Sequence, residues 1–400
     1  MTLRPFQQDC LDKLLWAGNQ PGNDLIQIAQ GGGKSHVLAE YAKAINEDVL
    51  ILQPSRELLI QNRSKLLECV PAGQIGIYSA SLLSKKVSKY TFATIGSCFR
   101  KPQEFSHFKT VIIDEAHLLN VKRQGSMLTS FLKAIGSPKT IGLTATPFRQ
   151  VQQYIRHSAW YVEAVTMTKM LNRMLPKFWD RLLYTISTQE LIAQGYLVPL
   201  TYVDKKLIDQ MEIPINKSKS DFDMEKFEDK IWGSVNQIVA TIKKAADHFN
   251  SILVFCSSIG AADALKLYLD GEDVEVVTSK TVKKERARIV NGFKEGKIKI
   301  VLNVGILTTG FDHPALDCIV LLRPCRSIGL YLQMLGRGSR IAPGKKTCYV
   351  VDFTDTVNKL GKIETFKIAK NDGLWDIQSE QGWWHKKPLY SFPIDIMRNS

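Results

Sequence analysis

The stretch Gln30-Gly31-Gly32-Gly33-Lys34-Ser35 follows a short apolar run, Leu25 to Ala29, and precedes a segment with helical spacing of apolar residues. A strand, a glycine-rich turn and a helix start in this order form a phosphate cradle, because backbone N–H groups face the anion. In such a loop Lys34 reaches the terminal phosphates and the Ser35 hydroxyl holds Mg²⁺. Ile28 stands where the G-x-x-x-x-G-K-[ST] pattern has its first glycine. The stretch alone therefore predicts either a phosphate loop or an ordinary turn.

The bulk composition bounds the class of protein. The chain has 400 residues, 44% of them hydrophobic, which is enough for two or three domains with buried cores. No apolar run approaches the roughly 18 residues of a membrane helix, and the N-terminus lacks the apolar region of a signal peptide. Seven scattered cysteines without a C-x-x-C pair argue against structural zinc and against a disulfide framework. We therefore expect no membrane partner and a cytoplasmic location.

The net charge of +14 suits a polyanionic partner. A soluble protein with a lysine-rich surface has the same charge, so this number does not decide between the two.

Two adjacent carboxylates follow another buried run. Thr110 to Ile113 is rich in β-branched residues, and Asp114-Glu115-Ala116-His117 comes directly after it. Carboxylates at this position are costly to bury unless they bind a cation or a proton. We expect Asp114 to hold Mg²⁺ through its water shell and Glu115 to deprotonate an attacking water. An acid-rich helix N-terminus is the ordinary alternative.

Three more apolar runs of the first 150 residues end in small or charged residues. They are Val49 to Leu52, followed by Pro54-Ser55-Arg56; Phe92 to Ile95, followed by Gly96-Ser97; and Thr140 to Leu143, followed by Thr144-Ala145-Thr146-Pro147. Alternation of strand and helix patterns predicts a parallel, doubly wound sheet over residues 1–150. All the special turns fall at carboxyl ends of strands, where open α/β sheets bind ligands. Their hydroxyl groups suit nucleic-acid phosphates, or plain turns.

Residues 151–234 change character. We expect a helical and extended interdomain connection in which Met167, Met170, Met174 and Trp179 pack an interdomain helix. Residues 216–230 read as a charged linker with few apolar residues.

A second alternating pattern predicts another α/β domain over residues 235–360. Its strands are expected at 252–255, 274–277, 298–302, 318–322 and 347–351. The loop from Asn303 to Asp312 is rich in small and hydroxyl residues. Arg337 and Arg340 are three apart, which places them on one face of a helix that begins near Ser327. Residues 361–400 are expected to form an aromatic-rich C-terminal tail that packs on the core.

These motifs together resemble the superfamily 2 helicases and translocases. Nine motifs occur in the family's order: an adenine-reading Gln motif (Gln7), motif I (Gly31 to Ser35), motif Ia (Pro54 to Leu58), motif Ib (Thr94 to Ser97), motif II as Asp-Glu-Ala-His (Asp114 to His117), motif III (Thr144 to Thr146), motif IV (near Phe255 to Ser258), motif V (Asn303 to Asp312) and motif VI (Gln333 to Arg340). Within the superfamily, Leu307 to Asp312, Leu322-Arg323-Pro324 and Gln333 to Gly338 look most like DEAH-type, RadD-like DNA repair helicases.

The resemblance implies two RecA-like domains with ATP and Mg²⁺ in a cleft between them. The implied nucleotide-binding and catalytic residues are Gln7, Gly31, Gly32, Gly33, Lys34, Ser35, Asp114 and Glu115 from the first domain, and Gly310, Asp312, Gln333, Arg337 and Arg340 from the second. Arg337 and Arg340 would act as arginine fingers. The implied nucleic-acid contacts are Arg56, Thr94, Ser97, Ser257 and Thr309, with His117, Thr144 and Thr146 coupling them to ATP.

The leading hypothesis is an ATP-dependent DNA helicase or translocase of repair, recombination or replication restart. It would bind single strands or branched duplex largely without regard to sequence. The alternatives are an RNA-dependent ATPase of the same superfamily, a double-strand translocase without strand separation, and a clamp that kept the fold without hydrolysis.

The sequence departs from the family in two ways. Ala29 and Gln30 stand where the family commonly has Pro and Thr. The cysteine-rich accessory region of RadD-type proteins has no counterpart, which suggests a minimal viral or mobile-element version in a bacterial or virus-infected host cytoplasm.

Overall fold

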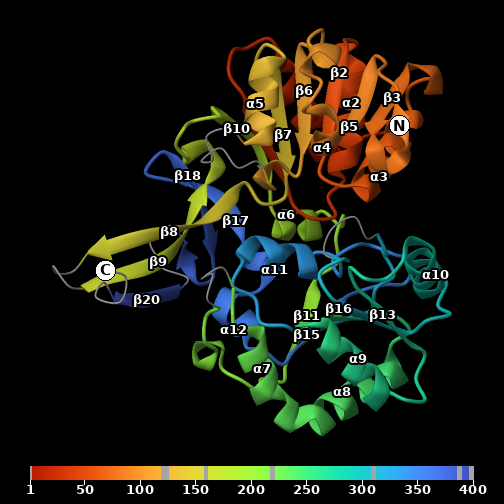
Figure 1. Cartoon of the computed structure of the whole chain (residues 1–400), viewed down its shortest axis with the longest axis vertical. Helices are drawn as coiled ribbons and strands as arrows, with labels where there is room; N and C mark the ends of the chain where they lie inside the picture. Colours follow the sequence, from red (N-terminus) through yellow and green to blue (C-terminus); the bar gives the residue numbers. More distant parts are fainter. Residues whose placement is uncertain are drawn as a thin grey trace. The chain divides into compact units, whose positions relative to one another are not determined.

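The computed structural model describes residues 2–118, 126–156, 161–216, 221–307, 312–384 and 390–395. The chain forms two compact units (Figure 1). Unit 1 comprises Met1–Ser187, Lys367–Gln378 and Gly382–Ser400, and unit 2 comprises Thr188–Phe366 and Ser379–Gln381. Each unit is built around one large sheet.

The sheet of unit 1 has eight strands in the order β10-β1-β7-β6-β2-β5-β3-β4. They are β1 (Asp24–Ile28), β2 (Val49–Gln53), β3 (Ile75–Ser79), β4 (Ser84–Lys85), β5 (Tyr90–Thr94), β6 (Thr110–Asp114), β7 (Lys139–Thr144) and β10 (Arg181–Ile186). Only the short edge strand β4 runs antiparallel to its neighbour. The strands expected from the apolar runs of the first 150 residues are confirmed, and their carboxyl ends share one edge, because every other pairing in this sheet is parallel.

The helices of unit 1 connect these strands. They are α1 (Pro5–Gly18), α2 (Lys34–Ile45), α3 (Arg56–Leu67), α4 (Ile95–Cys98) and α5 (Met127–Ala134). Right-handed crossovers place α2 and α3 on one face of the sheet and α4 and α5 on the other. Local sequence explains the helix starts: Pro5 occupies the first turn of α1, and the Ser55 hydroxyl accepts the N–H of Leu58 at the start of α3.

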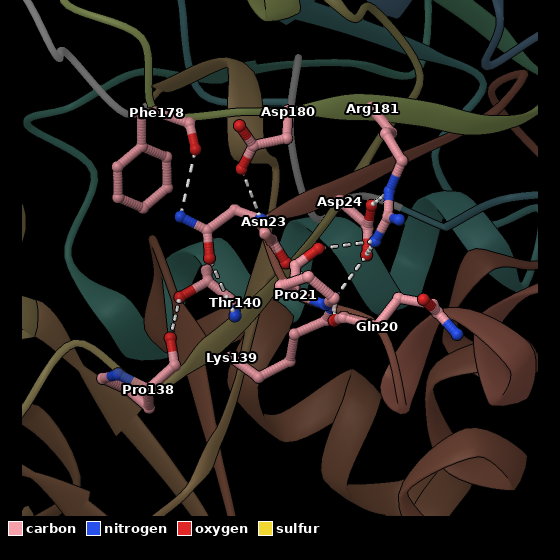
Figure 2. Close-up of polar contacts among 11 residues, drawn as sticks. Gln20, Pro21, Asn23, Asp24, Pro138, Lys139, Thr140, Phe178, Asp180 and Arg181 are labelled. Atoms are coloured by element: carbon pink, nitrogen blue, oxygen red, sulfur yellow. Dashed lines mark hydrogen bonds and ion pairs between the residues drawn. The ribbon is translucent and has the colours of Figure 1, made fainter.

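Strand β10 joins the first sheet from far along the chain, beside β1 (Figure 2). The buried Asp24 carboxylate accepts hydrogen bonds from Lys139 Nζ at 2.6 Å and from Arg181 Nε and Nη2 at 2.6 and 2.9 Å. Further along β1, Gln27 Oε1 accepts the N–H of Ile186 at 3.0 Å. These side-chain contacts fix β10 at both of its ends.

Residues 148–156 and 161–170 form paired strands, so the expected interdomain helix around the methionines is wrong. Strands β8 (Phe148–Arg156) and β9 (Tyr161–Met170) pair antiparallel, and β20 (Tyr390–Asp395) from the tail pairs with β9. Met167 and Met170 therefore lie on a strand. The alternation of Val162, Ala164 and Thr166 with other residues is the period-2 signal of a strand.

The tail adds a second small antiparallel sheet of β17 (Lys367–Asn371), β18 (Leu374–Ser379) and β19 (Gly382–Trp383). Within unit 1, Arg173 donates to the buried Asp376 at 3.0 Å. The tail aromatic Trp384 is 2% exposed.

The sheet of unit 2 has six parallel strands in the order β11-β16-β15-β12-β14-β13. They are β11 (Leu200–Asp204), β12 (Ile252–Cys256), β13 (Val274–Val277), β14 (Ile300–Asn303), β15 (Cys318–Leu322) and β16 (Cys348–Asp352). Its helices are α6 (Thr188–Ala193), α7 (Met224–Ile231), α8 (Val235–His248), α9 (Ile259–Tyr268), α10 (Lys283–Lys294), α11 (Ile328–Leu335) and α12 (Thr356–Leu360). The second parallel domain is confirmed. The range 151–234, expected as a connection, contains β10 of the first sheet and β11 of the second.

Residues 221–231 lead into and form helix α7 of unit 2. The expectation of a charged linker over 216–230 is therefore wrong from residue 221 onward. Asp223 caps α7 by accepting the N–H of Lys226. Phe227 and Ile231 are 0% and 5% exposed. Two apolar residues four apart are enough to bury one face of a two-turn helix whose other positions, apart from Met224, are charged.

Candidate nucleotide and nucleic-acid site

The turn between β1 and α2 has the geometry of a phosphate cradle. Gly31 and Gly33 have φ angles of 83° and 85°, which residues with a side chain rarely adopt. A Cβ on Gly33 would also lie 2.5 Å from Nε2 of Gln7. Helix α2 begins at Lys34, so its first N–H groups have no partner within the helix and face the turn. Lys34 Nζ lies 3.5 Å from the carbonyl oxygen of Ile28, at the limit of a hydrogen bond.

Gln7 is held against this cradle. Its Nε2 donates to the carbonyl oxygen of Gly32 at 3.1 Å, and its Oε1 accepts the N–H of Arg4 at 3.0 Å. The side chain is 4% exposed. The structure thus places the predicted adenine-reading residue beside the predicted phosphate loop.

Asp114 ends β6 and is 7% exposed. Its Oδ2 accepts a hydrogen bond from Asn62 Nδ2 at 2.7 Å, and its Oδ1 accepts the N–H of Glu115 at 2.9 Å. Burial and the neighbouring Glu115 raise the pKa of Asp114, and the positive charge of Lys34 opposes that rise. A cation would relieve the cost of burying this carboxylate. Together with the Ser35 hydroxyl it offers the oxygen ligands that Mg²⁺ prefers, so the donor set fits the ion.

Glu115 has a strained backbone, with a φ of 50°, and its side chain is 7% exposed. Its Oε2 is buried and accepts no hydrogen bond from the described residues, although His117 Nδ1 lies 3.3 Å away. Strain of this kind at a buried acid is typical of functional positions. A carboxylate oxygen without a donor can accept a proton from water, which is the chemistry expected of a general base.

His117 links motif II to motif III. Its Nδ1 is hydrogen-bonded to Thr144 Oγ1 at 3.0 Å, and the same Thr144 oxygen accepts the N–H of Thr146. Burial, Lys34 and Arg149 lower the pKa of His117 to about 4. The imidazole is therefore neutral near pH 7, and its 3.3 Å approach to Glu115 is no ion pair. The predicted coupling residues are thus brought into contact.

The predicted strand contacts of unit 1 lie on the same sheet edge. Thr94 ends β5, and its Oγ1 lies 2.9 Å from Ser97 Oγ. Ser97 Oγ also accepts the N–H of Ala80 at 3.0 Å. Arg56 opens α3, and its Nε is buried without a partner among the described residues. Hydroxyl groups and a partly free guanidinium next to a helix start are suitable contacts for phosphates.

In unit 2 the expected helix face of arginines is wrong. Helix α11 ends at Leu335, and Arg337 and Arg340 lie in the turn that follows it. The segment after α11 packs closely against β16. A Cβ on Gly338 would lie only 2.7 Å from Cys348 Sγ. Arg337 is 4% exposed, and Arg340 forms an ion pair with Asp312.

The structure describes some of the other predicted residues of unit 2 and not others. Gln333 lies on α11 and is 8% exposed. Asp312 is the ion-pair partner just described, whereas Thr309 and Gly310 lie outside the described residues.

The motif IV residue Ser257 already has a protein partner. Its hydroxyl donates to the carboxylate of Glu228 on α7 at 2.5 Å. Nearby in sequence, Asp221 accepts a hydrogen bond from Arg323 Nη2 at 2.7 Å. Because Ser257 follows β12 and Arg323 follows β15, residues 221–231 place two carboxylates at the carboxyl edge of the second sheet.

Two polar residues near Asp114 escaped the sequence reasoning. Asn62 occupies a buried position of α3 together with Leu58, Leu59 and Leu66, and Gln53 ends the otherwise apolar β2. A polar residue at an apolar position of a regular element was the available signal. Among the described residues, no group of three or more His, Cys, Asp or Glu side chains forms a further metal site. No helix in the described ranges is long and apolar enough to cross a membrane.

Residues 1–149 match the family model of the type III restriction enzyme res subunit, and residues 234–342 match that of the helicase conserved C-terminal domain. The putative ATP-dependent helicase IRC3 of Saccharomyces cerevisiae is 26% identical over 377 residues, which cover 88% of this chain and 51% of the yeast protein. The chain thus spans about half the length of this curated relative.

Two solved structures show the same fold. The fragment of a putative HsdR subunit of a type I restriction enzyme from Vibrio vulnificus YJ016 has a TM-score of 0.66 at 20% identity, with 96% of this chain and 67% of that chain covered. The ATP-dependent type ISP restriction-modification enzyme LlaBIII, bound to DNA, has a TM-score of 0.64 at 16% identity, with 88% and 28% covered.

Proposed function

The chain belongs to the superfamily 2 helicases, with two RecA-like domains, and from this premise we propose that it is a DNA-dependent ATPase that moves along a strand. The observation that carries the proposal is the meeting of two motifs at one sheet edge. Lys34 opens α2 after β1 and Asp114 ends β6, and both strands pair in parallel with β7, so the two residues share its carboxyl edge. A phosphate cradle next to a magnesium-binding carboxylate and a base is the set of groups that phosphoryl transfer to water needs.

The proposed roles follow from the geometry of unit 1. The turn N–H groups and Lys34 would bind the terminal phosphates, and Ser35 and Asp114 would hold Mg²⁺. The ion would neutralise charge on the phosphate oxygens when bound. Glu115 would take the proton of the attacking water through its unpaired Oε2. Gln7 would read adenine from its position beside Gly32.

Unit 2 would supply the arginines. Arg337 and Arg340 are proposed to stabilise the charge that develops on the transferred phosphoryl group, an effect of roughly 10³–10⁵ in turnover in such enzymes. Arg340 would exchange its ion pair with Asp312 for this role.

DNA is the proposed strand, and RNA is the second candidate. The predicted contacts Arg56, Thr94 and Ser97 are a guanidinium and hydroxyls suited to phosphates, which both nucleic acids share. Placement among RadD-like enzymes and a role in repair, recombination or replication restart are parts of the same proposal, supported by the motif sequences.

The test is an ATPase assay with single-stranded DNA and RNA of equal length. We expect Lys34→Ala to abolish both basal and stimulated hydrolysis, and DNA to stimulate the wild-type chain more than RNA. Unchanged hydrolysis in Lys34→Ala would refute the assigned site, and stronger stimulation by RNA would refute the choice of strand. Arg56→Ala should weaken binding of DNA without changing nucleotide affinity.

A further inference from the structure

Gln53 is a buried amide for which the described residues provide no hydrogen bond. It is the last residue of β2 and 2% exposed. Both its Oε1 and its Nε2 are buried and unpartnered. Buried polar groups are nearly always hydrogen-bonded, so a fully unpaired amide requires an explanation.

The position of Gln53 in the sheet supplies one. On one side, Gln53 is in register with Thr94 of β5. On the other side, Leu52 is in register with Ile113 of β6, so the residues that follow them, Gln53 and Asp114, lie at matching positions. Side chains at the same register position of parallel strands point to the same face of a sheet. Gln53 therefore stands in one row between a predicted nucleic-acid contact, Thr94, and the predicted magnesium ligand, Asp114.

Asn62 reaches Asp114 from the helix that follows. Its Nδ2 donates to Asp114 at 2.7 Å, its side chain is 1% exposed, and its Oδ1 has no partner among the described residues. Asn62 is on α3, whose first residue is the predicted strand contact Arg56. At 1.5 Å per residue the two are about 9 Å apart along the helix axis, so one rigid element joins a strand contact to the metal ligand.

We propose that Gln53 and Asn62 are positioning residues that couple nucleic-acid binding at the edge of unit 1 to magnesium–nucleotide binding at Asp114. Asn62 orients the Asp114 carboxylate from α3, and the amide of Gln53 completes its hydrogen bonds only when strand and nucleotide are bound. The proposal rests on the proposed function, because it needs both ligands to bind at this edge.

The two substitutions separate coupling from folding. Gln53→Met removes an amide that has no partner in the free protein, so we expect the variant to be at least as stable as the wild type. Asn62→Ala removes the hydrogen bond to Asp114. Ser64→Ala is the matched control, because Ser64 is exposed on the same helix and bonds only to the Gln61 carbonyl of its own helix.

The experiment measures the affinity of mant-ADP with Mg²⁺, in the full chain, with and without saturating oligo(dT). The ratio of the two affinities is the coupling between the sites, and it is reciprocal, so oligo(dT) affinity must change by the same factor when mant-ADP is present. We expect the ratio to fall toward 1 in both variants and to stay at the wild-type value in Ser64→Ala. The stimulation of ATPase over its basal rate should fall with it, by about tenfold in Asn62→Ala.

A wild-type ratio in a folded Gln53→Met and in Asn62→Ala would overturn the proposal. So would a marked loss of thermal stability in Gln53→Met, because the amide would then serve the fold. If the wild-type chain bound no mant-ADP, or if Lys34→Ala hydrolysed ATP normally, the proposed function itself would fail, which is a separate outcome.

Discussion

The attachment of β10 to the first sheet can be tested with a single atom exchange, Asp24→Asn. The Asp24 carboxylate is 0% exposed and accepts three charge-assisted hydrogen bonds, one from Lys139 and two from Arg181. Breaking a buried ion pair on one side typically costs about 3–5 kcal/mol. Lys139 keeps the carbonyl oxygens of Gln20 and Gly22 as acceptors, and the Arg181 side chain is 32% exposed. We therefore place the loss of unfolding free energy at or just below the lower limit of this range, about 2–3 kcal/mol.

Urea unfolding monitored by tryptophan fluorescence is a suitable assay, because the Arg181 guanidinium lies 5.6 Å from the ring of the exposed Trp16. Asp9→Asn is the matched control. Asp9 pairs with Lys13 one helical turn away, and the two side chains are 55% and 47% exposed, so its loss should cost no more than about 0.5 kcal/mol. Equal effects of the two substitutions would refute the reasoning that burial makes the Asp24 network strong.

Three further predictions follow from single contacts. Glu115→Gln should slow ATP hydrolysis by roughly 10²–10⁴-fold while mant-ATP still binds, and a normal turnover would remove Glu115 as the base. Glu228→Gln should tighten binding of oligo(dT) roughly fivefold, because a carboxylate beside Ser257 repels a phosphate by about 1 kcal/mol. Glu225→Gln, exposed on the same helix, is the control and should leave the affinity unchanged. Equal affinities of the wild type and both variants would exclude Ser257 as a contact. His313 is 5% exposed, its Nε2 lies 2.7 Å from Ser251 Oγ, and burial lowers its pKa to about 4. Because the unfolded chain binds this proton near pH 6.5, this contribution to stability should be full above that pH and fall by about 3 kcal/mol between pH 6.5 and 4. Denaturant midpoints measured across this range should depend less on pH in His313→Gln than in the wild type.

Local patterns carried most of the site prediction. The order strand, glycine-rich turn and helix placed Lys34 and Ser35 at a strand end, and the β-branched run before Asp114 placed the acid pair at the same edge. In both cases the same residues form the local structure and the site. Gly33 adopts the φ of 85° that the turn requires, and Asp114 is buried where its strand ends. Such sites can be predicted from short stretches of sequence.

Structure that depends on distant partners was missed. β10 joins β1 through Asp24 and Gln27, residues more than 150 positions earlier in the chain. No pattern within β10 itself indicates that pairing. The end of α11 at Leu335 was also missed, although Gly336 and Gly338 were visible. Beyond that end, the backbone of Gly338 packs closely against Cys348 of β16, a contact that local sequence does not indicate.

The glutamines of β1 and β2 show why a polar residue in a buried strand is ambiguous until its partners are known. Gln27 and Gln53 are 5% and 2% exposed, and both stand near the carboxyl end of a fully buried strand. Gln27 donates to Ala145 and accepts from Ile186, so its amide ties motif III and β10 to β1. Gln53 makes neither kind of bond with the described residues. The fold therefore accounts for the partners of Gln27, whereas the partners of Gln53 would come from the strand and nucleotide whose binding we propose at this edge.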